Sequence, residues 1–158
     1  MVVSGNVMKW AMRFYPPLFF QRIWVMRFDK DFKSVRVKIS RSMLNKNYND
    51  SLFGGTIYSA ADPFYPILFH QVLLRKNYDI LVWTKSAQIT YFKPGRTNLY
   101  FEAAITEEDI AEAEQILKTE GKYHKSFPLE IYDKHGDICA IVMNEVYLRI
   151  KHFKETKI

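Results

Sequence analysis

Cysteine is almost absent from the sequence, which has one, Cys139, among 158 residues. A single thiol cannot close an intramolecular disulfide, which excludes the disulfide-rich secreted domains and makes a reducing cytoplasm the expected location. The run DICAIVMNEVYL around Cys139 is typical of a buried strand. We therefore predict a structural cysteine and not a nucleophile.

A long uninterrupted apolar run is also missing. Large apolar residues are frequent in residues 7–28, but four basic residues and the pair Pro16-Pro17 divide them. This pattern excludes a secretory signal core and a simple membrane span. It predicts two short helical pieces within an N-terminal arm, residues 1–33, that covers the core. An anchor on a membrane surface is the alternative for residues 7–28.

Motifs for metal or nucleic acid are lacking as well. The histidines have no close ligand spacing, which predicts no bound metal; they are His70, His124, His135 and His152. The formal net charge of +6 favours an anionic partner, which leaves nucleic acid, an anionic membrane surface or a phosphorylated cofactor. No Arg/Lys-rich helix, paired zinc ligands or RNP-type strand is present, which argues against nucleic acid.

Apolar periodicity predicts a single α+β domain over residues 34–152, followed by a short basic tail at 153–158. The segment from Gly54 onward is apolar on nearly every side of a helical wheel, as in a buried helix, and Pro63 and Pro66 should kink or restart it. Strands are predicted around 34–40, 79–92, 97–105, 124–132 and 137–151, with an amphipathic surface helix between Thr106 and Gly121. Such a helix is best buried when a curved antiparallel sheet wraps around it.

Two motifs resemble those of the hotdog-fold thioesterase superfamily. In FGGTIYSAADPF, residues 53–64, two glycines open the helix and Asp62 stands seven positions after Gly55. The segment ITYFKPGR, residues 89–96, is similar to the family's strand that ends in a Lys/Arg-Pro-Gly turn. More closely, the chain resembles an uncharacterised thioesterase-like branch. The resemblance implies a hotdog domain that forms a homodimer or a dimer of dimers and hydrolyses an acyl-CoA thioester. Coenzyme A would enter as part of the substrate, with no bound cofactor.

Thioester hydrolysis needs an oxyanion site and a group that activates water. Gly54 and Gly55 can offer unpaired N–H groups at the positive end of the helix dipole, and they are the oxyanion candidates. Asp62 is the candidate general base or nucleophile, as the resemblance implies. Its apolar neighbours predict a buried carboxyl, and burial would raise its pKa unless a partner compensates. The alternative role for Asp62 is an N-cap ahead of Pro63. Phe53 replaces the His that many such thioesterases carry, which motivates an acyl-CoA or fatty-acyl binding protein without turnover as the alternative function.

The remaining candidates surround the substrate. The resemblance implies that a neighbouring subunit completes the site from residues 82–88, so Thr84, Lys85 and Ser86 are candidates to hold water or substrate. The candidates for contact with the rest of the substrate precede the helix or follow the hairpin: Asn47, Asn49 and Phe53 for the acyl carbonyl region, and Lys93 and Arg96 for the coenzyme A phosphates. Turn chemistry is the alternative for the two asparagines, and ordinary exposed charge is the alternative for Lys93 and Arg96.

Overall fold

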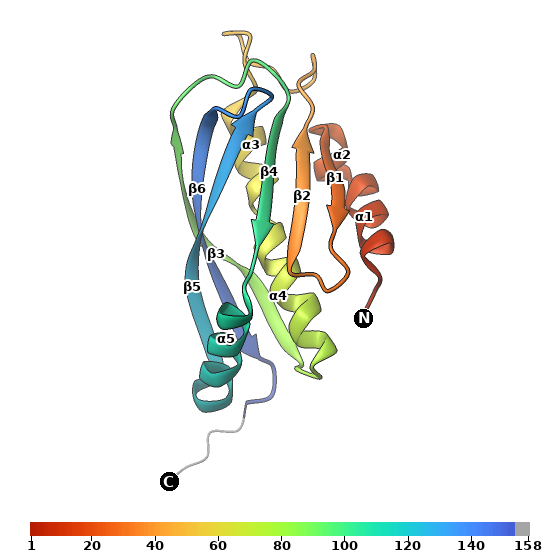
Figure 1. Ribbon diagram of the computed structural model, residues 1–158, viewed down its shortest axis with the longest axis vertical. Coiled ribbons are helices and arrows are strands. Elements are labelled where there is room, and N and C mark those ends of the chain that lie inside the picture. The colour runs from red at the N-terminus through yellow and green to blue at the C-terminus, as the bar shows by residue number, and fades with distance from the viewer. Residues whose placement is uncertain (154–158) are drawn as a thin grey trace.

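The computed structural model describes residues 1–153, in which six strands form one antiparallel sheet that curves around a central helix (Figure 1). The strands are β1 Ile23–Phe28, β2 Ser34–Ile39, β3 Ile80–Tyr91, β4 Leu99–Ala104, β5 Lys122–Asp133 and β6 Ile138–Ile150. Their order across the sheet is β1-β2-β4-β5-β6-β3, and each neighbouring pair is antiparallel. The predicted α+β arrangement is confirmed.

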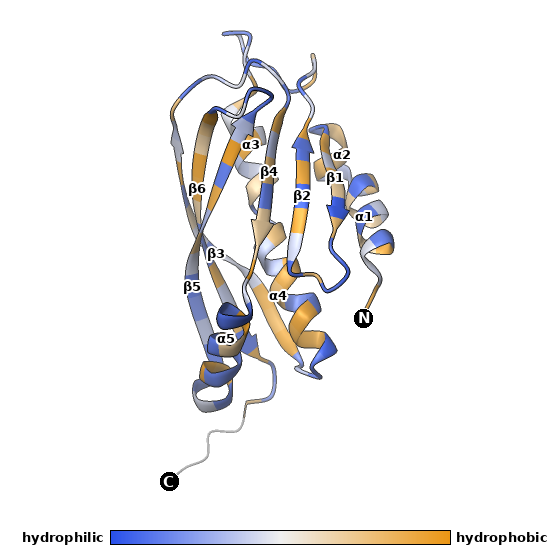
Figure 2. Ribbon diagram, viewed as in Figure 1, coloured by the Kyte–Doolittle hydropathy of each residue, from blue (hydrophilic) through white to orange (hydrophobic). Residues whose placement is uncertain are grey.

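The central helix consists of two segments, α3 Gly54–Ala61 and α4 Phe64–Arg75. Asp62 and Pro63 between them keep right-handed helical backbone angles, so the helix path continues through the break. The predicted restart at this point is confirmed. Helix α4 packs its large apolar side chains against the sheet, and apolar residues recur along this helix (Figure 2). Its side chains with 0% exposed area are those of Phe64, Leu68, Phe69 and Leu73.

The N-terminal arm is shorter than predicted. Helices α1 Gly5–Phe14 and α2 Pro16–Phe20 are the two predicted helical pieces. The prediction of a helix is wrong for residues 23–28, which form β1 and pair with β2. Ile23 and Val25 are fully buried, and the free edge of β2 supplies the hydrogen bonds that a strand needs. The sheet domain therefore begins at residue 23, and the arm that lies outside the sheet comprises residues 1–22.

The two edges of the sheet differ. Helix α1 packs along β1, and the Arg13 Nε–H donates to the backbone oxygen of Val25 at 2.8 Å. The opposite edge, β3, is a twelve-residue strand that pairs on one side with β6 and has no second strand partner in the described chain. A long unpaired edge is a common site of association with another chain.

The surface helix and the last two strands follow the predictions. Helix α5 Glu107–Glu120 begins with a capping box between Thr106 and Asp109 and ends at Gly121, whose φ is 72°. Cys139 on β6 is fully buried, as predicted for a structural cysteine, and burial raises the pKa of its thiol. Of the predicted tail at 153–158, all but Phe153 lies outside the described residues.

Candidate active site

The start of α3 carries the two predicted oxyanion donors. Gly54 and Gly55 occupy the first two helical positions, whose N–H groups have no partner within a helix. Their N-cap, Phe53, offers no side-chain acceptor. Two backbone bonds hold this helix start in place: Phe53 N–H donates to Asn45 O at 2.8 Å, and Leu52 N–H donates to Gly95 O at 2.9 Å. The result is a fixed helix N-terminus that can bind an anionic oxygen.

A cavity of about 350 Å³ opens beside this helix start, between the 47–52 loop and the turn after β3. It brings together three predicted site residues, Asn47, Gly54 and Lys93. It also contains Tyr91, which the sequence interpretation missed. The Tyr91 hydroxyl donates to Gly54 O at 2.9 Å, and partial burial raises the pKa of Tyr91, which favours the protonated donor. Tyr91 stands directly before the Phe92-Lys93-Pro94-Gly95 turn, which is the signal that could have identified it.

Phe53 covers the second glycine. Phe53 is 57% exposed, and a Cβ built on Gly55 would lie only 2.4 Å from the Phe53 ring. The ring therefore rests against the bare Cα of Gly55, next to one of the two free N–H groups. Only glycine allows this approach without displacing the aromatic ring. Phe53 is thus placed to contact whatever binds at the helix start.

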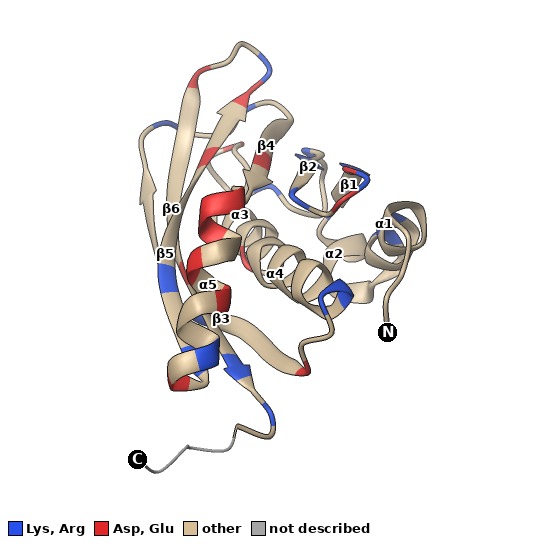
Figure 3. Ribbon diagram, turned by 60° about the horizontal axis from the view of Figure 1, so that its bottom comes forward, with Lys and Arg blue, Asp and Glu red and all other residues tan. Residues whose placement is uncertain are grey.

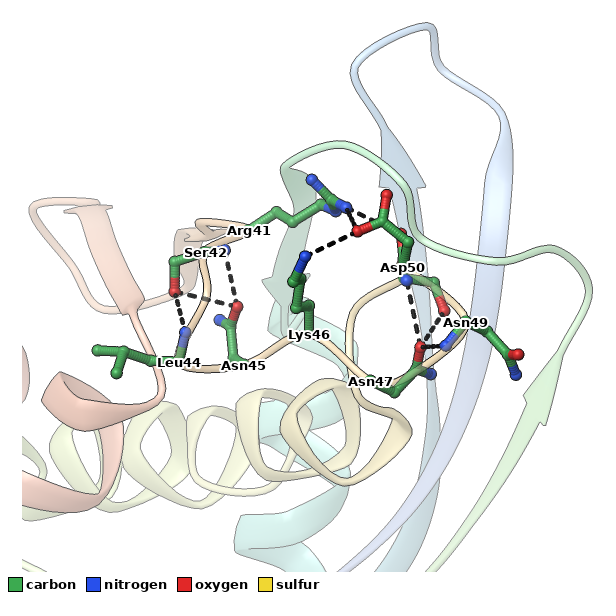
Figure 4. A network of polar contacts seen from close by, with 9 residues as sticks. Arg41, Ser42, Leu44, Asn45, Lys46, Asn47, Asn49 and Asp50 are labelled. Atoms are coloured by element: carbon green, nitrogen blue, oxygen red, sulfur yellow. Dashed lines mark hydrogen bonds and ion pairs between the residues drawn. The ribbon is translucent and has the colours of Figure 1, made fainter.

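The loop before α3 is organised by asparagine side chains (Figure 4). Asn47 Oδ1 accepts hydrogen bonds from the backbone N–H groups of Asn49 and Ser51 at 3.0 and 3.2 Å. Asn47 therefore shapes the turn while it also lines the 350 Å³ cavity. Asn49 is exposed at the tip of the loop, and the bond it contributes comes from its backbone. Turn chemistry accounts for what the structure shows of Asn49.

Asp62 lies on the exposed side of the central helix, at the C-terminal end of α3. Two predictions about it are wrong. Asp62 is exposed and not buried, because the sheet covers only part of the helix circumference; and it is not an N-cap, because α4 begins without a side-chain capping bond. Asp62 instead borders a cavity of about 410 Å³. Its other lining residues include Tyr15 and Gln21, which flank α2, and Tyr58 and Ser59 of α3.

The Thr84 side chain contacts the backbone of Asp62. The Thr84 hydroxyl donates to Asp62 O at 2.9 Å. In a continuous helix this carbonyl would accept the N–H of residue 66, but Pro66 has none. Thr84 therefore satisfies the carbonyl that Pro66 leaves free, and it fixes the backbone that carries the Asp62 side chain.

We expect Thr84→Val, which removes the hydroxyl and keeps the shape, to lower the free energy of unfolding by about 1–2 kcal/mol. In a Pro66→Ala background the new N–H of residue 66 can bond to Asp62 O, so the same change should cost on the order of 0.5 kcal/mol or less. Chemical denaturation of the four proteins in this double-mutant cycle measures the coupling. Thr90→Val, at an exposed position of the same strand, is the matched control. Additive effects would contradict the assigned role of Thr84.

Lys85 and Ser86 contact Glu145 and not Asp62. Lys85 Nζ and Ser86 Oγ both bond to the Glu145 carboxylate, at 2.9 and 2.6 Å, and His124 Nδ1 lies 3.2 Å from it. The residues that flank Glu145 on β6 are fully buried, so strand alternation places Glu145 on the outer face of the sheet. A bulge lies between Thr84 and Ser86, so Thr84 pairs with Val146 and Ser86 pairs with Glu145. Within one chain, Thr84 alone of the three contacts Asp62.

Lys93 and Arg96 differ in how their charges are used. Lys93 Nζ lies 2.9 Å from a carboxylate oxygen of Asp133 and 2.5 Å from one of Asp137, and these hydrogen bonds raise the pKa of Lys93. The same contact lowers the pKa of Asp133 to about 2. Arg96 is exposed and has no carboxylate within ion-pair distance among residues 1–153. Arg96 is therefore the better candidate for a phosphate contact.

Comparison with known proteins identifies the family. The model of a family described as a domain of unknown function, DUF4442, matches residues 5–148. The chain belongs to this family. The DUF4442 match covers both motifs, the central helix and the described strands up to β6. A search of curated proteins found no match.

Solved structures similar to this DUF4442 protein confirm the hotdog fold. PA5026 of Pseudomonas aeruginosa, "Protein of Unknown Function" and "Probable Thioesterase", has a TM-score of 0.78 at 18% identity and covers 94% of this chain and 97% of its own. Thioesterase HI1161 of Haemophilus influenzae has a TM-score of 0.70 at 9% identity, and the match covers 96% of this chain and 95% of HI1161. The PaaI protein from a degradation operon of E. coli has a TM-score of 0.64 at 16% identity. The match covers 93% of this chain and 96% of PaaI. At these identities the likeness establishes the fold.

Proposed function

We propose that this protein hydrolyses an acyl-CoA thioester to the free acid and coenzyme A. The observation that carries the proposal is the position of two residues on one side of the central helix. Gly55, with a free N–H at the helix start, and Asp62 are seven residues apart, which places them on the same side of the helix. The names of thioesterase HI1161 and of PA5026, which share the fold, point to the same chemistry.

Each group has a defined role in the proposed reaction. The N–H groups at the helix start bind the thioester oxygen and stabilise the negative charge that develops on it. Asp62 accepts a proton from water as the water oxygen attacks the carbonyl carbon. The carbon–sulfur bond then breaks, and the coenzyme A thiolate leaves and takes up the proton. Tyr91 and Thr84 hold the backbone at Gly54 and Asp62, respectively.

A second copy of the chain is needed to complete this site. Seven helical residues separate Gly55 and Asp62 by about 10 Å along the axis, too far for one carbonyl and its attacking water. The free edge of β3 is the contact that we propose for two chains, with the Asp62 of each chain acting at the helix start of the other. We therefore propose a homodimer or a dimer of dimers in which each site uses both chains.

A non-catalytic acyl-CoA binder is the second candidate. Phe53 rests on Gly55 and cannot donate a hydrogen bond, whereas a His at this place could. One experiment distinguishes a binding protein from an enzyme. Purified protein of known mass from light scattering is given acyl-CoAs of increasing chain length, and both binding and release of free thiol are followed. Thiol release by a dimer or tetramer supports the enzyme, and saturable binding without release supports the binder.

Arg96→Ala tests the phosphate contact. One exposed charge-assisted bond corresponds to roughly a three- to tenfold rise in KM, with kcat nearly unchanged, because such a contact binds ground state and transition state alike. The difference from wild type should shrink at high salt. Lys118→Ala, an exposed base on α5, is the matched control. If KM for acyl-CoA does not change in Arg96→Ala, the phosphates bind elsewhere.

A further inference from the structure

The outer side of α1 carries an exposed apolar stripe, which we define as Val7, Trp10 and Phe14. These residues recur at helical spacing, and they are 57%, 50% and 68% exposed, respectively. Met8 and Met12, on another side of the helix, pack against the core. The helix is therefore held on the sheet domain by one set of apolar residues and presents a second set to the outside. This second set is available for contact with a partner.

The charge around the stripe has one sign. Residues 1–28 contain no aspartate or glutamate and four bases, Lys9, Arg13, Arg22 and Arg27. None of the four has a carboxylate within ion-pair distance in the described part of the chain, and α1 shows basic but no acidic residues (Figure 3). Lys9 Nζ and the Arg13 guanidinium lie 5.4 and 4.9 Å from the centre of the Trp10 ring. Positive charge thus flanks the exposed aromatic stripe directly.

We propose that the arm docks on an anionic lipid bilayer, with the stripe in the headgroup region and the flanking bases against lipid phosphates. A surface helix with apolar and aromatic side chains on one side and Lys/Arg beside them is suited to this interface. Lys9 can extend around Trp10 to reach the headgroups. Arg13 is held at the Val25 backbone oxygen by its Nε–H and adds positive charge beside Trp10. In residues 1–153 no helix is long and apolar enough to cross a membrane.

Two other partners fit the stripe less well. A nucleic acid would neutralise the bases but would leave Val7 and Phe14 without an apolar partner. A second copy related by a twofold axis through α1 would bring Lys9 and Arg13 against their own equivalents, and such like-charge contacts are unfavourable. A bilayer that contains anionic lipid satisfies both the apolar and the basic groups.

Cosedimentation with vesicles tests the docking. The full-length protein is mixed with vesicles of phosphatidylcholine alone, or with vesicles of phosphatidylcholine that contain about 30% phosphatidylserine, at low and physiological salt. We expect binding to the anionic vesicles that weakens as salt rises. Trp10→Ser combined with Phe14→Ser should lower the vesicle affinity on the order of tenfold or more, and Lys9→Glu should lower it severalfold. Met143→Ser and Lys118→Glu, exposed changes outside the arm, are the matched controls.

The variants also separate docking from catalysis. Trp10 and Phe14 lie outside the candidate active site, so the double variant should keep the wild-type mass and hydrolyse soluble acyl-CoA at the wild-type rate. Absence of vesicle binding by the wild type, or equal binding by wild type and double variant, would overturn the proposal. A fall in oligomer mass in the double variant would assign the stripe to a contact between copies. Binding to an oligonucleotide in place of vesicles would assign the bases to nucleic acid.

Discussion

Asp62→Asn is expected to lower kcat by about a hundredfold to ten-thousandfold, the usual effect of losing a positioned general base. Asn nearly matches Asp in shape but cannot accept a proton from water. The free energy of unfolding should stay within about 0.5 kcal/mol of wild type, because the side chain is exposed and makes no capping bond. The variant should also keep its oligomeric mass and its affinity for acyl-CoA. Initial rates of thiol release and chemical denaturation measure the two quantities.

Asp31→Asn is the matched control, because Asp31 is another exposed carboxylate without an ion pair in the described chain, and it should leave kcat unchanged. A single turnover in ¹⁸O-labelled water separates the two chemical roles of Asp62. A general base places the label in the product acid in the first turnover. A nucleophile forms an acyl anhydride with Asp62, and when water cleaves this anhydride at the Asp62 carboxyl carbon, the first product acid carries the unlabelled Asp62 oxygen and the label enters Asp62. Wild-type hydrolysis by Asp62→Asn would remove Asp62 from the reaction.

Local signals in the sequence predicted the elements that depend on neighbouring residues. Thr106 and Asp109 form the expected capping box, and Ile110, Ala113 and Leu117 form the buried side of α5. The restart of the central helix at Pro63 follows from the missing backbone donor of proline. In each case the residues that decide the structure lie within one or two helical turns of one another.

Features that depend on distant partners could not be predicted in this way. Residues 23–28 form a strand because the free edge of β2 lies beside them, and nothing within the segment specifies that edge. Asp62 sits in an apolar helix but is exposed, because the curvature of the sheet decides which side of the helix is covered. Tyr91 joins the candidate site through Gly54, 37 positions earlier in the chain. The family motif indicated where the site lies, but not how these contacts support it.

Asn45 makes several hydrogen bonds to residues that lie far from it in the sequence, and we expect a large loss of stability when it is replaced. It is 4% exposed, and its amide nitrogen donates to Gln21 O at 2.7 Å and Ser40 O at 2.9 Å. Its amide oxygen accepts from Ser42 N–H at 2.9 Å (Figure 4), and its backbone oxygen accepts from Phe53 N–H at 2.8 Å. One residue thus ties the end of the arm, the end of β2 and the start of the central helix together.

Asn45→Leu is expected to lower the free energy of unfolding by about 3–5 kcal/mol, because it leaves several buried backbone groups without partners. Asn45→Asp should be at least as damaging at pH 7, since a carboxylate would face the carbonyl oxygens of Gln21 and Ser40. That repulsion raises the folded-state pKa of the new carboxyl above its unfolded value, so part of the lost stability should return as the pH falls through the folded pKa. Urea denaturation at pH 7 and pH 4 measures both effects, and Asn49→Leu, at the exposed tip of the same loop, should change stability by about 0.5 kcal/mol or less. A loss below about 1 kcal/mol in Asn45→Leu would show that the three segments hold together without this side chain.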